Sequence, residues 1–524
     1  MDIVKDKNGR TLSTEKEVQQ IWTEHFGEVL NRPDPVNPAE VPEEHFMDEL
    51  TISEDPLTKE EIISTVRELK NGKAAGFDEV SPDVLKADPA ATADILDSLL
   101  KKIWEQENIP EDWRRGLIIK LPKKGDLTMC GNWRGITLLS MVGKVMARSI
   151  IKRLRDSVDR RLRKEQGGFR PNRGTGMQIF ILRNIIEQSL EWNAALYLVF
   201  VDYEKAFDSI HRETLWKIMR HYGIPEKYVR LVKMFYDRSK CSVITEAGTG
   251  PWFEIKSGVK QGCVMSGFLF ILVIDWIMRR TTAQHRTGIQ WTITEQLEDL
   301  DYADDIVGIS SSWNHAQEKL TRMSEIGRRT GLIINKEKTK IIRINPNRMD
   351  PVTLEGEVVE EVDIFSYLGA HVDKTGGAEQ DIRRRIGLAS AAFWKFAKVW
   401  KSSSYWRRTK LRLFNSNVVS VLLYGCETWK MGKEDEKRLD VFQHRCLRQI
   451  LKIKWPMKVS NQEVRQRAGV TSTISQQVRQ RRWRFIGHVL RSDDEHTKVA
   501  LSWTPAGRRN KGRPRETWRR TAER

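Results

Sequence analysis

Two acidic stretches, far apart along the chain, carry residue types from which a metal-dependent site can be built. The first, Phe200-Val201-Asp202, ends an apolar run, and the second, Tyr302-Ala303-Asp304-Asp305, has apolar residues on both sides. Such runs predict strands, and carboxylates at a strand end and at the tip of a neighbouring hairpin can converge. Buried without partners they would cost several kcal/mol each, and divalent cations are the usual remedy. Two Mg²⁺ ions ~3.5–4 Å apart support phosphoryl transfer, so Asp202, Asp304 and Asp305 are predicted to be catalytic.

Either stretch alone has a simpler interpretation. Aspartate favours turns, so a Tyr-x-Asp-Asp sequence is compatible with a solvated hairpin tip. The pair is more informative, because each member places an acid beside a predicted apolar strand.

Four further stretches occur around the acidic pair in a defined order: Gln166–Pro171, Gly258–Gly267, Gly331–Lys340 and Phe365–Gly369. Together with the acids they resemble the palm motifs of reverse transcriptases, most closely those of LINE-type (non-long-terminal-repeat) retrotransposons. The resemblance runs from about Leu57 to the C-terminus. The ordered set is far more specific than any one of its members.

The resemblance implies an α+β fold, the right-hand polymerase with fingers, an antiparallel palm sheet and a helical thumb. We expect an acidic N-terminal linker and helix over 1–56, and an N-terminal extension with the fingers over 57–190. The palm, with finger insertions, is expected over 191–370. The helical thumb then spans 371–460 and a basic C-terminal extension spans 461–524.

The implied reaction is RNA-templated DNA synthesis from deoxynucleotides (dNTPs). Asp202 and Asp304 would bridge two Mg²⁺ ions, for which Mn²⁺ could substitute, and Asp305 would be an outer or second ligand. The backbone carbonyl of Tyr203 is a further ligand implied by the resemblance.

Several residues are expected to hold the incoming nucleotide. In the basic hairpin after residue 116, Arg134 and one of Lys120, Lys123 or Lys124 would bind phosphates. A solvated turn also accounts for the lysines. Phe207 would exclude a ribose 2′-hydroxyl, or else simply anchor the following helix. Lys338 would donate a proton to pyrophosphate, or else form an ordinary surface ion pair. The remaining members of this predicted set are Gln261 and Gly262.

A turn that supports the primer strand, the primer grip, is implied for one short segment. Its residues are Phe365, Tyr367, Leu368 and Gly369.

The charge is unevenly distributed. The net charge is +18. Counting Lys and Arg against Asp and Glu gives −9 for residues 1–60, +5 for 61–370 and +22 for 371–524. A basic C-terminal third favours nucleic-acid partners, here an RNA template and a DNA primer or target, although a basic soluble surface alone is the alternative. The arginines predicted to contact nucleic acid are Arg170, Arg481, Arg482, Arg484 and Arg513.

Tryptophans are frequent beyond residue 390 and often neighbour basic residues, a pattern suited to stacking on bases. Trp394, Trp400 and Trp429 are instead predicted to be packing residues. The segment Arg508–Arg515 is predicted to be a disordered basic tail, within which Lys511-Gly512-Arg513-Pro514 resembles an AT-hook core.

Five cysteines favour a reducing compartment over a disulfide framework. The polar N-terminus and the short apolar runs argue against a signal peptide and against membrane insertion. We therefore expect an intracellular protein of the nucleus or of a cytoplasmic ribonucleoprotein. No nuclease cluster is evident, so target nicking is expected to need a separate or missing endonuclease.

Two other functions remain compatible with the sequence. An RNA-dependent RNA polymerase uses the same palm, but Phe207 and Ala303 disfavour it. A decayed element could persist as a non-catalytic nucleic-acid-binding protein, which the intact acids and Gln261-Gly262 disfavour.

Overall fold

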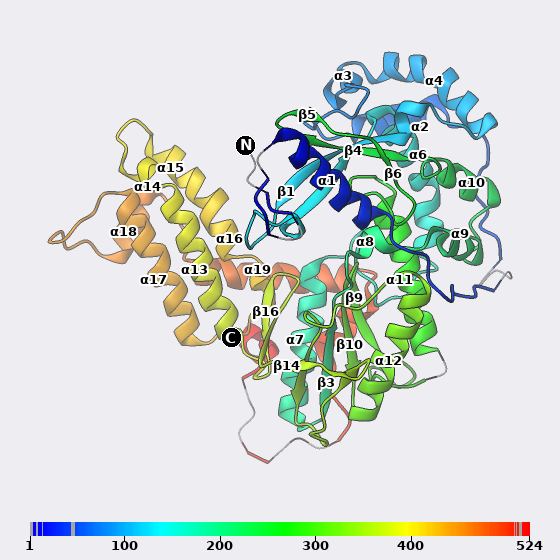
Figure 1. Ribbon diagram of the computed structural model, residues 1–524. Coiled ribbons are helices and arrows are strands. Elements are labelled where there is room, and N and C mark those ends of the chain that lie inside the picture. Colours follow the sequence, from blue (N-terminus) through cyan, green and yellow to red (C-terminus); the bar gives the residue numbers. More distant parts are fainter. Residues whose placement is uncertain are drawn as a thin grey trace. The chain divides into compact units, whose positions relative to one another are not determined.

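The computed structural model describes residues 4–6, 9–12, 14–42, 48–283, 285–507, 509, 511–512 and 516–523. The chain forms two compact units, coloured along the sequence in Figure 1. The first unit comprises residues 1–163, 203–283 and 322–335, and the second comprises 164–202, 284–321 and 336–524. The chain therefore passes between the units several times. The five segment boundaries expected from the sequence stay a prediction.

The first unit is built on a sheet with the order β2-β1-β4-β5, in which β6 also pairs with β4. The strands β1 (Arg115–Pro122) and β2 (Trp133–Leu138) form an antiparallel hairpin, as predicted, and η1 (Cys130–Asn132) lies in its connection. The other strands are β4 (Lys240–Thr245), β5 (Gly248–Thr249) and β6 (Phe253–Glu254).

Helices surround this sheet. The first, α1 (Glu15–Leu30), begins with a capping box at Thr14 and packs Trp22 and Phe26 against Ile118 of β1. The helix α2 (Lys59–Arg67) also begins with a capping box, between Thr58 and Glu61. The remaining helices are α3 (Pro82–Ala87), α4 (Pro89–Gln106), α5 (Glu111–Arg114), α6 (Met141–Asp159), α8 (Ala206–Ser209), α9 (Arg212–His221), α10 (Glu226–Met234) and α11 (Ser266–Thr282).

The second unit contains the palm sheet, with the strand order β14-β11-β3-β10-β9. Neighbouring strands are antiparallel except β14, which pairs with β11 in parallel. Figure 1 shows α7 (Thr175–Trp192) alongside this sheet, and its apolar residues share a core with the central strands. The bounds are β3 (Leu196–Val201), β9 (Asp299–Tyr302), β10 (Asp305–Ser310), β11 (Lys340–Ile344) and β14 (Glu360–Glu361). The helix α12 (Trp313–Arg329) begins in this unit and ends in the first.

Three two-stranded sheets complete the β-structure of the second unit. They are β7 (Ile289–Gln290) with β8 (Gln296–Leu297), β12 (Thr353–Leu354) with β13 (Glu357–Val358), and β15 (Ile364–Tyr367) with β16 (Ala370–Asp373).

A helical bundle with its own core follows β16. Its elements are α13 (Glu379–Lys395), α14 (Ala397–Lys401), α15 (Arg407–Phe414), η2 (Asn415–Val419), α16 (Ser420–Leu422), η3 (Cys426–Thr428), α17 (Lys433–Ile450) and α18 (Asn461–Ala468). The predicted packing role of Trp400 and Trp429 is confirmed, because both are buried in this core. The prediction for Trp394 is wrong, since 49% of this residue is exposed.

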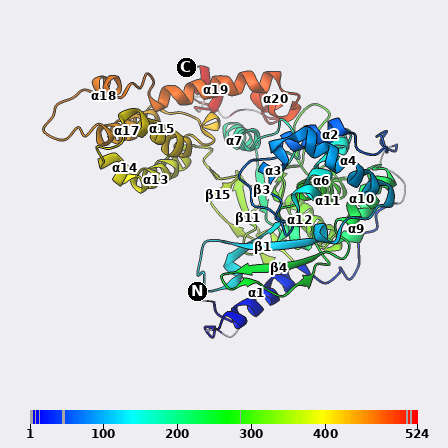
Figure 2. The same ribbon diagram turned by 90° about the horizontal axis from the view of Figure 1, so that it is seen from above.

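The last helices return to the palm core. Figure 2 shows α19 (Ile474–Arg491) leading from the bundle to α20 (Glu495–Ser502). Trp503 and Trp518, the latter at the start of α21 (Trp518–Glu523), are buried among residues of α7 and the palm strands. Part of the predicted basic extension is therefore core. Across the described residues, no helix is long and apolar enough to cross a bilayer.

Candidate active site

The register of the palm sheet brings the predicted catalytic carboxylates together. Val201, at the end of β3, pairs with Ile306 of β10, and Asp305 pairs with Tyr302 across the β9–β10 hairpin. Continuing the antiparallel register by one residue places Asp202 opposite Asp305. Asp304 lies in the hairpin turn between β9 and β10. The sequence predicted this convergence, and the strand order β3-β10-β9 provides it.

The turn itself is held by a buried glutamine. Gln166 Oε1 accepts hydrogen bonds from the backbone N–H of Gly168 (2.7 Å) and of Ala303 (2.9 Å). A side chain at Gly168 could not fit, because its Cβ would lie 2.3 Å from Ala303 N. Ala303 has a φ of 58°, which an alanine adopts only at a cost. The Gln166–Pro171 stretch therefore fixes the conformation of the Tyr302–Asp305 motif.

Sequence reasoning assigned no role to Gln166. Its glycine neighbours were the signal that could have revealed it, because paired glycines often mark a close backbone approach.

A lysine lies against the carboxylates. Lys338 Nζ forms an ion pair with Asp202 Oδ2 at 2.7 Å. Partial removal of water and the charges of Asp304 and Asp202 raise the pKa of Asp305 to about 6, while Lys338 lowers it. The structure thus shows the ion pair that the sequence left as one alternative for Lys338.

This donor set fits hard divalent cations. Carboxylate oxygens are the ligands that Mg²⁺ prefers, and the mutual repulsion seen at Asp305 is what a bound cation would relieve. Among the described residues, however, no group of three metal-ligating side chains is already arranged around one point. Tyr203 belongs to the first unit, where its backbone bridges to Ile334, and its carbonyl stays a predicted ligand.

In the first unit, a second cluster forms around Gln261. Its carbonyl accepts a hydrogen bond from Thr137 N of β2 at 2.7 Å, and its Nε2 donates to Asp208 Oδ2 at 3.0 Å. Gly262 has a φ of 117°, and a Cβ there would lie 2.3 Å from Thr137 O. Only glycine suits this position, so the Gln-Gly pair holds the loop before α11 against the fingers hairpin.

Asp208 is a buried carboxyl that lies in this cluster. It accepts the hydrogen bond from Gln261 and is 8% exposed. Burial raises the pKa of Asp208 to about 7, against the opposing charges of Lys205 and Arg134.

Phe207 is half-buried and stacks on Phe270 of α11, with ring centroids 4.4 Å apart. The stacking fixes the position of the aromatic ring. Both predicted roles remain compatible with it, the helix anchor and the platform beneath a sugar.

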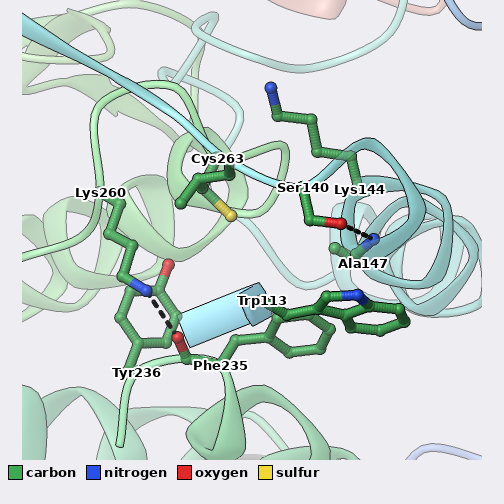
Figure 3. A pocket seen from close by; sticks show the side chains of 10 residues that line it. Trp113, Ser140, Lys144, Ala147, Phe235, Tyr236, Lys260 and Cys263 are labelled. Carbon is green, nitrogen blue, oxygen red and sulfur yellow. Dashed lines mark hydrogen bonds between the residues drawn. The ribbon is translucent and has the colours of Figure 1, made fainter. Parts of the chain in front are cut away.

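A buried lysine, Lys260, holds the loop that carries Gln261. Figure 3 shows Lys260 beside Tyr236, with its amine bonded to the carbonyl of Phe235. That hydrogen bond is 2.8 Å long, and burial lowers the pKa of Lys260 to about 8. The cavity between these residues and Trp113 measures ≈ 20 Å³, room for one water molecule. Sequence reasoning missed Lys260, because a lysine between Val259 and Gln261 gives no periodic sign of burial.

In the fingers hairpin Arg134 and Lys123 are exposed, whereas Lys120 is half-buried and its amine lies over the ring of Trp22. Arg134 is available to a ligand and close enough to lower the pKa of Asp208. Lys123 Nζ donates a hydrogen bond to the carbonyl of Gly131, at 3.3 Å. Their assignment to phosphates stays a prediction.

The predicted primer grip is a tight hairpin turn. Leu368 and Gly369 connect β15 to β16, both with positive φ, 47° and 78°. Phe365 stacks on Phe200 of β3 with ring centroids 4.2 Å apart, and Tyr367 is buried. The turn is therefore rigidly attached to the strand that ends in Asp202.

The thumb side of this turn is also fixed. The carbonyl of Leu368 accepts a hydrogen bond from Tyr424 Oη at 2.8 Å, and that of Gly369 accepts one from Arg384 at 3.0 Å.

The arginines predicted to bind nucleic acid differ in availability. Arg484 is exposed, Arg481 is exposed but bonded to Leu423 O, and Arg170 is bonded to Gln166 O. The assignment of Arg482 is corrected. It is 2% exposed and donates to Trp518 O and Thr521 Oγ1, which leaves its guanidinium inaccessible to a nucleic acid. Arg513 lies outside the described residues.

A palm sheet with converging aspartates is the architecture of the right-hand polymerase class. Residues 121–372 match the family model described as reverse transcriptase (RNA-dependent DNA polymerase). This part of the chain is therefore similar to reverse transcriptase domains. Residues 392–424 match a domain of unknown function.

The most similar proteins include two from insect transposable elements. The chain is 27% identical to "Probable RNA-directed DNA polymerase from transposon BS" of Drosophila melanogaster, over 75% of this chain and 44% of that protein. It is 26% identical to "Retrovirus-related Pol polyprotein from type-1 retrotransposable element R2" of Popillia japonica, over 65% of this chain and 48% of that protein. The chain thus spans less than half the length of these relatives.

A solved structure of telomerase from Candida tropicalis with a fragment of telomeric RNA is also similar. It is 14% identical, with 81% of this chain and 72% of that chain covered and a TM-score of 0.39.

Proposed function

We propose that the chain is the RNA-directed DNA polymerase of a LINE-type retrotransposon. The observation that carries the proposal is the register of the palm sheet, which places Asp202 opposite Asp305 within the region that is similar to reverse transcriptase domains. The substrates would be an RNA template, a DNA primer and dNTPs.

In the proposed reaction a primer 3′-hydroxyl attacks the α-phosphorus of a dNTP, and pyrophosphate leaves. Asp202, Asp304 and Asp305, with the Tyr203 carbonyl, would hold two Mg²⁺ ions. When bound, such ions lower the pKa of the attacking hydroxyl and neutralise the leaving phosphates.

The protein's own groups have separate tasks. Arg134 and Lys123 would bind the triphosphate, while Phe207 would exclude a 2′-hydroxyl. Lys338 would leave its ion pair with Asp202 and protonate the leaving pyrophosphate, which its exposed, flexible side chain allows.

We further propose that target nicking requires an endonuclease activity. The site of action would be the nucleus or a cytoplasmic ribonucleoprotein. The basic charge of residues 371–524 supports a nucleic-acid partner in either place.

Primer extension tests the proposal directly. The full chain, a DNA primer annealed to an RNA template, Mg²⁺ and dNTPs should give template-dependent products. Asp304→Asn should reduce incorporation by at least about 10³-fold, since a metal ligand acting in the transition state is lost. Asp363→Asn is the matched control, because Asp363 is an exposed aspartate of the same unit, paired with Lys374; this variant should extend normally.

Three outcomes of these experiments would contradict the proposal. Incorporation that persists in Asp304→Asn would refute the mechanism. Extension with ribonucleotides and little with dNTPs would instead indicate an RNA polymerase. Binding of the primer–template without any extension would indicate a non-catalytic nucleic-acid-binding protein.

A further inference from the structure

Two loops of the helical bundle expose large aromatic and sulfur-containing side chains to solvent. The first loop, residues 402–406, carries Tyr405 and Trp406, which are 50% and 82% exposed. The second, residues 452–458, carries Trp455 and Met457, which are 94% and 62% exposed. Neither indole stacks on a ring or forms a hydrogen bond within the described part of the chain. We call these two loops together the bundle tip.

Both loops lie at the same end of the bundle. Glu379, the first residue of α13, forms an ion pair with Arg438 in the second turn of α17 at 2.7 Å, so the two helices begin together. The other evidence comes from Lys410 of α15 and Lys452, which follows α17. Removal from water lowers the pKa of Lys410, and the charge of the nearby Lys452 lowers it further. Figure 1 shows both loops projecting from the end of the bundle away from β16.

The bundle tip is positively charged throughout. The chain has no aspartate or glutamate from 382 to 426, nor from 441 to 462. Exposed cations at or beside the two loops are Lys395, Lys398, Lys401, Arg407, Arg408, Lys452, Lys454 and Lys458. None of these eight forms an ion pair with any residue that the structure describes. Lysine is depleted at protein–protein interfaces, whereas six of these eight exposed cations are lysines.

The tip is also remote from the predicted primer grip. The Leu368–Gly369 turn contacts Arg384, near the start of α13, through the Gly369 carbonyl. The tip lies beyond the other end of α13, which is 17 residues long, or ~25 Å at 1.5 Å per residue. A nucleic acid on the tip would therefore occupy a different site.

We propose that the bundle tip binds single-stranded RNA, with bases stacked on Trp406 and Trp455 and phosphates neutralised by the surrounding lysines and arginines. Unpaired bases expose the faces that stacking needs, and a duplex does not. The site assigns a role to part of the segment that matches a domain of unknown function. It does not depend on the polymerase activity proposed above.

The test measures binding of a labelled single-stranded RNA of mixed sequence to the full chain by fluorescence anisotropy. Trp406→Ala and Trp455→Ala should each weaken binding about fivefold or more, because one stacked base is lost. Trp455→Phe should restore most of the affinity. Leu490→Ala is the control, since Leu490 is 61% exposed but lies on α19, outside the tip.

Crosslinking separates the tip from any other RNA site on the chain. RNA that contains 4-thiouridine should crosslink to peptides spanning Trp406 and Trp455, and single-stranded RNA should compete for these crosslinks better than a duplex of the same length. Extension of a short annealed primer–template should stay unchanged in the double variant, which shows that the polymerase is intact.

Unaltered binding in Trp406→Ala/Trp455→Ala, or crosslinks confined to other peptides, would overturn the proposal. So would equal competition by the duplex. Loss of self-association in that double variant, with RNA binding intact, would show that the tip binds protein instead.

Discussion

At the scale of single residues, Lys338 competes with cations for the aspartates. Its ammonium lies 2.7 Å from Asp202 Oδ2 and lowers the pKa of Asp305. Lys338→Met should therefore tighten Mn²⁺ binding to the nucleotide-free protein by about two- to fivefold, in line with the strength of an exposed ion pair. Titration of free Mn²⁺ by electron paramagnetic resonance measures this. Lys336→Met, which removes an exposed lysine paired with Glu357, should change nothing; weaker binding in Lys338→Met would contradict the expectation.

Burial of Asp208 should make the stability of the protein depend on pH. Its pKa is raised to about 7, so between pH ~4 and 7 the folded protein retains a proton that the unfolded chain releases. The stability contribution of this group therefore falls as pH rises through that window and stays low above it. Asp208→Asn, which is neutral at every pH, should gain stability relative to the unaltered protein between pH 5 and 8, by at most about 4 kcal/mol.

Thermal unfolding followed at several pH values measures that difference. Asp363→Asn, at an exposed position, should show no comparable trend. If the difference in stability between Asp208→Asn and the unaltered protein were the same at every pH, Asp208 would be ionised throughout this pH range.

At the scale of elements, the Gln166–Gly168 segment controls the β9–β10 turn. A Cβ at Gly168 would meet Ala303 N at 2.3 Å, so Gly168→Ala must displace the turn that carries Asp304. A displacement of about 1 Å can cost about 100-fold in rate, and we expect a loss of that order in primer extension. Gly174→Ala is the control, because no atom lies within 4 Å of its added Cβ. Equal activity in both variants would show that the turn is held by other contacts.

The C-terminal helix is a structural part of the palm unit. Trp518 is buried, its backbone N–H donates to Glu187 at 2.7 Å, and its carbonyl accepts from Arg482. Trp518→Ala should lower the free energy of unfolding by about 3–5 kcal/mol. Trp455→Ala, at an exposed position, should change it by less than about 0.5 kcal/mol. Denaturant unfolding compares the two, and similar small changes would mean that α21 is dispensable.

At the scale of the whole molecule, charge dominates the expected affinity for nucleic acids. The chain carries a net charge of +18, and residues 371–524 alone carry +22. If about six phosphates are contacted, RNA binding should weaken about 10²- to 10³-fold between 50 and 200 mM salt. Anisotropy titrations at several salt concentrations measure the slope. Sucrose at matched osmolality should have no such effect, and salt-independent binding would show that few phosphates are contacted.

Local features of the fold followed from the sequence. The β1–β2 hairpin, which was predicted, joins strands that are close in the chain, and the capping box at Thr58 is a pattern of four neighbouring residues. Trp394 and Arg482 were misjudged, one exposed and the other buried. Neither error was avoidable from local pattern, because the burial of a side chain depends on which distant elements cover it.

The sequence was enough to predict a polymerase palm, because the acidic pair and the ordered stretches around it together resemble the palm motifs of reverse transcriptases. Tertiary structure alone decided how those aspartates are held. The pairing of Val201 with Ile306 and the hydrogen bonds from Gly168 and Ala303 to Gln166 join segments far apart in the chain. Hydrogen bonds between such segments leave no periodic trace in a sequence, so their geometry is fixed only when the sheet and its core assemble.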